Sequence, residues 1–260
     1  MQDINLFQTT ESSDEDSTAW AIPFADMMTL LLTLFILLLV ILKESEKFID
    51  KQINLILNET YEQLQDKIKN EDVVIERVTK GIQITLRGNL FQSMKANVNK
   101  KYIPTINEIS RIIEDCRLFN LDETGDYKSL LDYLEKGNFE LNVEIRCEGH
   151  TDNAPLPKDS DFRSNWELSS ARSLRVVRIM ADASSISEKY FSYNGYGEYR
   201  PLIDVSLIED FNEKKRARAY NRRVEIYLDA SARPKTRSSE EEFIKMNANQ
   251  DENKELEIVQ

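Results

Sequence analysis

The 260-residue chain has one histidine, two cysteines, seven glycines and six prolines. So few histidine and cysteine side chains leave too few ligands of the usual kinds for a zinc site. The low glycine and proline content excludes a low-complexity or collagen-like chain. Neither G-x-x-x-x-G-K-S/T nor G-x-G-x-x-G occurs, which argues against nucleotide hydrolysis. We therefore expect no metal and no cofactor.

Basic residues are also scarce relative to acidic ones, with 34 Lys and Arg against 46 Asp and Glu and a net charge of −12. General nucleic-acid binding needs a basic surface, so a nucleic-acid partner is not expected. His150 and Asp152 are close in sequence, but no nucleophile or metal-ligand set accompanies them. We expect a protein that is not an enzyme.

Apolar residues are concentrated in one segment, residues 19–42, which reads AWAIPFADMMTLLLTLFILLLVIL and carries a single charge at Asp26. A helix of this length spans roughly 36 Å, enough to cross a bilayer. The alternative, a cleaved signal peptide, lacks a basic N-terminal region and a cleavage site with small residues. The segment predicts one retained transmembrane helix.

Asp26 lies one to two turns inside this apolar segment, where a carboxylate is costly and is functional by default. Such a group suits a site that binds and releases a proton or another cation. Thr29 and Thr33 fall on the same helix face and could place hydroxyl groups beside it. The alternative is that Asp26 only joins helices or marks the membrane boundary.

Residues 43–72 follow with charged side chains around a narrow apolar seam that includes Ile53, Ile56 and Leu64. The spacing predicts a helix with one apolar face. That face suits pairing with a second copy or docking on a partner. The alternative is a surface helix folded back on its own domain.

From residue 73 the pattern is that of a soluble domain. Alternation predicts strands near residues 73–78, 81–91, 141–150, 190–194 and 221–229, and apolar periodicity predicts helices near residues 104–116, 128–136 and 164–183. This order predicts an α+β sandwich with helices on one face of a small sheet. Residues 230–260 are polar and are expected to be disordered.

Four sequence blocks carry a family resemblance: GHTD at Gly149–Asp152, NWELSSARS at Asn165–Ser173, GYGEYRPL at Gly195–Leu202 and NRRVEI at Asn221–Ile226. In this order they resemble the OmpA-like peptidoglycan-binding domain. The apolar segment, with its F-A-D-x-M setting, resembles the membrane helix of MotB-type B subunits of ion-driven stator motors.

The resemblance implies a homodimer of this chain inside a pentamer of A subunits, similar to MotA or ZorA, in the bacterial inner membrane. Asp26 matches the aspartate that carries the ion, H⁺ or alternatively Na⁺. The N-terminus would be cytoplasmic and the OmpA-like domain periplasmic, bound to peptidoglycan. The implied parts are a cytoplasmic tail (1–18), a transmembrane helix (19–42), a linker or plug helix (43–72), the OmpA-like domain (73–229) and a disordered tail (230–260).

The resemblance also implies a site for the zwitterionic diaminopimelate of peptidoglycan stems. Asp152 would meet the ammonium group and Arg172 a carboxylate, which its planar guanidinium can bind in bidentate fashion. Thr151 and Asn165 would add hydrogen bonds, and Leu168 would pack beside them. In contrast, His150 is interpreted as shaping the loop, and Arg222 and Arg223 as holding the fold.

Two motors share this plan: the flagellar stator and the Zorya anti-phage system, whose B subunit is ZorB. The N-terminus without basic residues, the leucine-rich span and an insertion near residues 117–142 favour a ZorB-type subunit. A flagellar stator subunit and a passive wall anchor are the alternatives.

Cys116 and Cys147 both fall on the predicted core face of the domain. A periplasmic location would permit a disulfide between them, and two buried free thiols are the alternative.

Overall fold

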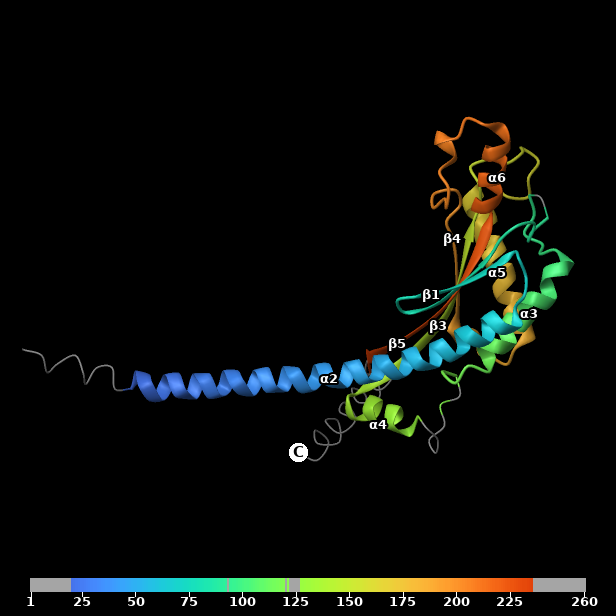
Figure 1. The fold of residues 1–260 in the computed structure, drawn as a ribbon. Helices are drawn as coiled ribbons and strands as arrows, with labels where there is room; N and C mark the ends of the chain where they lie inside the picture. The colour runs from blue at the N-terminus through green and yellow to red at the C-terminus, as the bar shows by residue number, and fades with distance from the viewer. Residues whose placement is uncertain (1–19, 93, 120, 122–126, 236–260) are drawn as a thin grey trace, which may run out of the picture. The chain divides into compact units, whose positions relative to one another are not determined.

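The computed structural model describes residues 20–235 except residues 93, 120 and 122–126 (Figure 1). The predicted N-terminal tail and residues 236–260 of the predicted C-terminal tail lie outside the described residues. The first helix, α2, runs over Ala21–Lys67, and the chain divides within it into two compact units, before and after residue 49.

In the first unit, the segment Ala21–Ile41 of α2 has a mean hydropathy of 2.6 and is long and apolar enough to cross a membrane. Its apolar side chains are exposed in the protein alone, with Leu32 at 59% and Leu39 at 60%. A row of exposed leucines suits hydrocarbon rather than water. This agrees with the predicted span over residues 19–42.

The second unit begins with the rest of α2, whose apolar side chains belong to the core of the domain. Leu57 and Leu64 are fully buried, and Ile49, Ile53 and Ile56 are at most 3% exposed. The Thr60 hydroxyl donates to Cys116 Sγ (3.1 Å), and Asn54 and Asn58 accept hydrogen bonds from Arg77. The apolar seam is therefore covered by the chain's own domain. The first interpretation of this apolar face, pairing with a second copy or docking on a partner, is therefore wrong for these residues. The alternative, a helix folded back on its own domain, is confirmed.

The domain is built on a five-stranded sheet with the order β1-β2-β5-β3-β4. The strands are β1 (Val73–Val78), β2 (Gly81–Leu86), β3 (Phe139–His150), β4 (Phe191–Gly195) and β5 (Arg223–Pro234). All pairs are antiparallel except β3 and β4. Because β3 and β5 are antiparallel, the end of β3 lies beside the start of β5, and this end carries the site.

Helix α5 (Asn165–Ala183) makes the crossover from β3 to β4 and packs on both strands, and α3 (Ile103–Glu114) packs against α5 (Figure 1). Period-two alternation turns Ile84, Ile226 and Cys147 to this covered face, where all are buried. The Ser164 side chain caps α5 by accepting from Glu167 N. The predicted α+β arrangement is confirmed.

Two glycines let α5 approach the sheet closely. A Cβ at Gly149 would lie 2.1 Å from the backbone oxygen of Ser169, and one at Gly195 would lie 2.4 Å from the backbone nitrogen of Ser170. Any larger residue would push the start of α5 away from the ends of β3 and β4. This contact sets the position of the functional side chains on α5.

Three features differ from the sequence-based expectation or extend it. Helix α6 (Phe211–Asn221) was not predicted. Strand β5 continues to Pro234, past the domain boundary expected at residue 229, because its last residues pair with the start of β3. The insertion near residues 117–142 contains α4 (Lys128–Lys136), whose Leu130 and Leu134 join the core.

Candidate functional site

A cleft of about 290 Å³ lies where β3 ends and α5 begins. Its walls come from the segment after β2, the loop after β3, the first turns of α5 and the residue before β5. Segments from three distant parts of the sequence thus meet at one end of the sheet. All five side chains predicted to bind peptidoglycan line the cleft: Thr151, Asp152, Asn165, Leu168 and Arg172.

Arg172 is the most unusual of these residues, because it is a charged residue that is only 5% exposed. It lies over the ring of Phe91, 4.8 Å from the ring centre, and its Nε donates to the backbone oxygen of Lys95 (3.1 Å). Burial, and then the positive charge of Arg222, lower the pKa of Arg172. An arginine remains charged at neutral pH even so. Among the described residues, no carboxylate lies within ion-pair distance of Arg172.

Asp152 is held on both carboxylate oxygens. Oδ1 accepts from the backbone N–H of Ala154 (3.1 Å), and Oδ2 accepts from Arg222 Nη1 (2.6 Å). Its side chain is 13% exposed, against 38% for Arg222. A carboxylate can accept about four hydrogen bonds, so Asp152 keeps capacity for an ammonium group. The cleft therefore carries two guanidinium groups and one carboxylate, an arrangement that favours a ligand with an anionic group.

The neutral side chains have different tasks. The Thr151 hydroxyl is buried and has no hydrogen-bond partner among the described residues, so it is free to bond a ligand. Asn165 Nδ2 donates to the backbone oxygen of Ala154 (3.0 Å) and to Glu198 Oε2 (2.9 Å). Asn165 thus fixes the loop after β3. Leu168, 2% exposed, supplies an apolar patch.

Arg222 was expected to hold the fold, and its ion pair with Asp152 does join the residue before β5 to the loop after β3, but Arg222 also lines the cleft, which was not predicted. The sequence does not reveal that His150 pairs with Arg223 in the sheet. This pairing places Arg222, the residue before β5, beside Thr151, the residue after β3. Arg223 does hold the fold. Its Nε bonds Glu225, and its other nitrogens reach backbone oxygens of Asn221 and Arg200.

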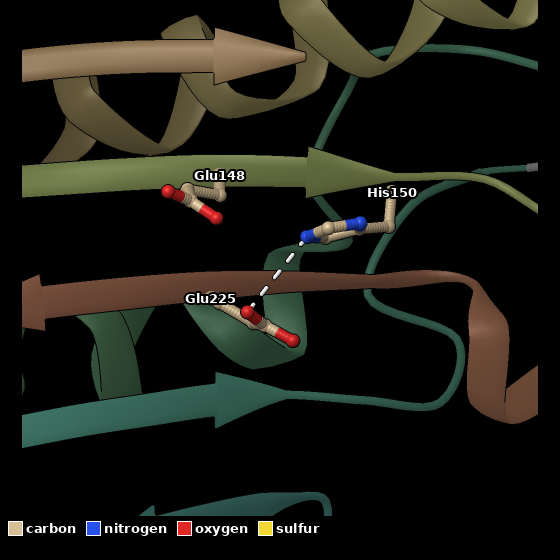
Figure 2. Close-up of side chains that lie close together, drawn as sticks. All are labelled: Glu148, His150 and Glu225. Carbon is tan, nitrogen blue, oxygen red and sulfur yellow. Dashed lines mark ion pairs between the residues drawn. The ribbon is translucent and has the colours of Figure 1, made fainter. Parts of the chain in front are cut away.

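His150 is not among the residues that line the cleft. Its ring is 2% exposed, stacks on Tyr196 with ring centres 5.4 Å apart, and points towards Glu225 on the neighbouring strand (Figure 2). Burial lowers the pKa of His150 to about 4, and Arg223 contributes to this while Glu225 opposes it. The imidazole is therefore neutral at neutral pH.

The residues predicted to carry the ion lie on the apolar segment of α2. The Thr29 hydroxyl donates to the backbone oxygen of Asp26 (2.8 Å), and the Thr33 hydroxyl donates to that of Leu30 (2.8 Å). Both hydroxyl protons are thus used within the helix, whereas the hydroxyl oxygens keep lone pairs. Their role, and that of the Asp26 carboxylate, stays a prediction.

The two cysteines are both free and buried. Cys116 lies just after α3, where it accepts the hydrogen bond from Thr60, and Cys147 lies on β3. Burial raises the pKa of both thiols. Of the two alternatives left open by the sequence, the structure has two thiols.

Comparisons with known proteins agree with this geometry. Residues 8–54 match the MotB_plug family model, described as membrane MotB of the proton-channel complex MotA/MotB, and residues 90–216 match the OmpA family model. Motility protein B of Bacillus subtilis is 29% identical over 166 residues, which cover 64% of this chain and about half (51%) of that protein. Motility protein B of Helicobacter pylori is 24% identical over 253 residues, covering 82% and 86% of the two chains.

A crystal structure of a putative MotB-like protein from Desulfovibrio vulgaris has the same fold, with a TM-score of 0.50 and 19% identity over 71% of this chain and 98% of that one. The fold and the matches define a protein with an OmpA-family domain behind an apolar helix. Residues 8–54 of this chain thus resemble the MotB plug segment, and residues 90–216, which follow it, resemble the OmpA family.

Proposed function

We propose that this chain is the B subunit of an ion-driven motor in the bacterial inner membrane and that its cleft anchors the motor to peptidoglycan. The observation that carries the wall-binding role is Arg172, a buried guanidinium group with no carboxylate partner among the described residues. Removing such a charge from water is costly unless an anion compensates it. A carboxylate of a peptidoglycan stem is an anion of the right size for the cleft.

The second charge of the proposed ligand is an ammonium group, which would bond Asp152. This carboxylate lies at the same cleft and already accepts from Arg222. A diaminopimelate residue carries both groups on one short chain. Ligands with only one of the two charges should therefore bind less tightly.

Binding to purified sacculi tests this role. Arg172→Ala in the full chain removes a charged hydrogen-bonding group, worth about 1.5–3 kcal/mol, so affinity should fall roughly 10- to 150-fold. Arg175→Ala is the matched control, because Arg175 lies on the same helix with an exposed side chain. Thermal unfolding of each variant checks that the domain is folded. Equal pelleting of folded Arg172→Ala and wild type would contradict the proposal.

The motor role is supported by the MotB plug match and by Asp26 within the apolar segment of α2. We propose that a homodimer of this chain lies within five A subunits, with its N-terminus cytoplasmic and its domain periplasmic, and that protons pass by Asp26. Sodium is the alternative ion, since a partner subunit could supply further oxygen ligands. A passive anchor would have no use for a carboxylate at this position.

The finer proposal is that the motor is a Zorya-type defence complex and this chain its ZorB subunit. The absence of Lys and Arg from the first 42 residues and the α4 insertion favour this role. The flagellar stator is the second candidate, because the named relatives are motility proteins. Deleting the chain together with its A subunit distinguishes the two: loss of phage protection supports defence, and loss of swimming supports motility.

A further inference from the structure

The face of the sheet opposite α3 and α5 carries a row of charged side chains. Register pairs Glu148 with Glu225 and His150 with Arg223, so these four side chains share that face. Figure 2 shows the imidazole of His150 and the carboxylates of Glu148 and Glu225 gathered between β3 and β5. One ligand atom from each of these three residues lies within 4.8 Å of the other two.

His150 is the residue of this cluster whose polar atoms lack partners. Both ring nitrogens are buried and lack a hydrogen-bond partner among the described residues. The nearest carboxylate oxygen, Glu225 Oε2, is 3.8 Å from Nε2, beyond hydrogen-bond distance. A buried polar atom without a partner is unfavourable, and buried polar groups in folded proteins are nearly always satisfied.

The two carboxylates are as deeply placed as the histidine, with Glu148 7% and Glu225 5% exposed. Arg146 Nε donates to Glu148 Oε1 (2.8 Å), and Arg223 Nε donates to Glu225 Oε1 (2.5 Å). Outer hydrogen bonds of this kind commonly orient carboxylates that bind a metal. The second oxygen of Glu225, Oε2, accepts from the Tyr227 hydroxyl (2.6 Å), so a metal would share this oxygen with Tyr227 or displace its hydrogen bond.

Charges of both signs surround the cluster. Arg146 forms a second ion pair with Asp229 (3.1 Å). The ion pairs form two separate groups, Arg146 with Glu148 and Asp229, and Arg223 with Glu225. The histidine adds no charge at neutral pH. Arg223 and Arg200 act on the imidazole as positive charges and Glu225 as a negative one, so a bound dication would depend on direct bonds to the imidazole nitrogen and the carboxylate oxygens.

We propose that Glu148, His150 and Glu225 bind a divalent transition metal, with Zn²⁺ as the metal that the ligand set fits best. One imidazole nitrogen with two carboxylate oxygens suits zinc, whereas Mg²⁺ and Ca²⁺ take oxygen ligands. Three atoms within 4.8 Å of one another have a common centre no more than about 2.8 Å away, so each would move by at most roughly 0.7 Å to reach zinc-bond length. The expectation of no zinc site counted only histidine and cysteine.

The metal would join β3 to β5 next to Thr151, where the cleft begins. Its effect would be to fix the end of the sheet from which Asp152 and Arg222 extend. This role is independent of what the cleft binds, because the three ligands lie outside the cleft.

The test uses the full chain in detergent, stripped with a chelator and then titrated with ZnCl₂. Because the sequence has a single histidine, selective ¹⁵N-histidine labelling gives one imidazole spin system for NMR. We expect one-to-one binding by calorimetry, a shift of the metal-bound ring nitrogen, and no such response to MgCl₂. An imidazole signal that is unchanged at excess zinc would overturn the proposal.

Isosteric variants assign the ligands. Glu148→Gln and Glu225→Gln should each weaken zinc binding at least about tenfold. Glu144→Gln is the matched control, because Glu144 lies on the same strand and face but outside the three-residue cluster. Zinc binding that is equally strong in all three variants would locate the metal elsewhere and refute the site. If a glutamine variant fails to fold, the wild-type imidazole titration still decides.

Discussion

Leu57 lies in the part of α2 that belongs to the domain, and its side chain is fully buried. Leu57→Ala removes apolar surface and leaves a cavity in a closely packed core. For a fully buried leucine this costs about 3 kcal/mol of unfolding free energy. In a domain of this size, that corresponds to a fall in Tm of about 6–12 °C.

Leu55→Ala is the matched control, because Leu55 is on the same helix, two residues away, and is 46% exposed. Leucine and alanine have similar helix propensity, so the two variants differ mainly in burial. We expect Leu55→Ala to change the unfolding free energy by no more than about 0.5 kcal/mol. Both variants would be measured as the full chain in detergent, by urea and thermal unfolding followed by circular dichroism.

Repeating the unfolding measurements at several protein concentrations tests whether the apolar face of α2 packs within one chain or between two copies. If the seam packed on a second copy instead of the domain core, dilution would increase the loss of stability in Leu57→Ala. Packing within one chain predicts a loss that is independent of concentration. Equal effects of the two substitutions, or a clear dependence on concentration, would refute the assignment of α2 to the domain core.

Three further predictions concern single residues of the domain. Burial raises the pKa of the Cys116 and Cys147 thiols, so both should resist maleimide at pH 7.5 and react only after the domain is unfolded. Mass spectrometry would count the labelled thiols, and rapid labelling of the native chain would contradict their burial. Gly149→Ala should lower Tm and also weaken binding to sacculi, because the added Cβ would lie 2.1 Å from the backbone oxygen of Ser169. An unchanged Tm together with unchanged binding would count against the close packing of α5. Ser164→Ala should cost about 1 kcal/mol on urea unfolding through loss of the α5 cap, and a neutral result would speak against the capping bond.

The predicted cleft residues came together because each lies in a motif at the same end of the sheet. Thr151 and Asp152 directly follow β3, and Asn165, Leu168 and Arg172 lie on the first turns of α5. Arg222 was missed because its place depends on the pairing of β3 with β5, which joins residues far apart in the sequence. Local pattern carries no information on such a pairing.

The apolar face of α2 illustrates a different limit. Ile53, Ile56 and Leu64 were predicted to be buried, and they are. Whether such a face packs on its own domain or on a second copy cannot be read from periodicity, because both arrangements bury the same side chains. The contact of Thr60 with Cys116 resolves the choice in the structure.

Two elements gave too weak a signal to be predicted. Helix α6 buries only Ala217 and Asn221, so it has no apolar stripe with helical period. The end of β5 reads ASARP and lacks alternating apolar residues. It is held as a strand by pairing with the first residues of β3, a long-range contact.

We propose that Asp26 carries the ion that drives a wall-anchored motor. Asp26→Asn, co-expressed with the A subunit and assayed for phage protection and swimming, tests it most directly. Asp50→Asn is the control, because Asp50 is an exposed aspartate on α2 outside the apolar segment. We predict that Asp26→Asn abolishes whichever activity the wild type supports, with complex assembly and sacculus binding intact, and that Asp50→Asn does not. Full activity of Asp26→Asn would contradict the motor and leave a passive anchor.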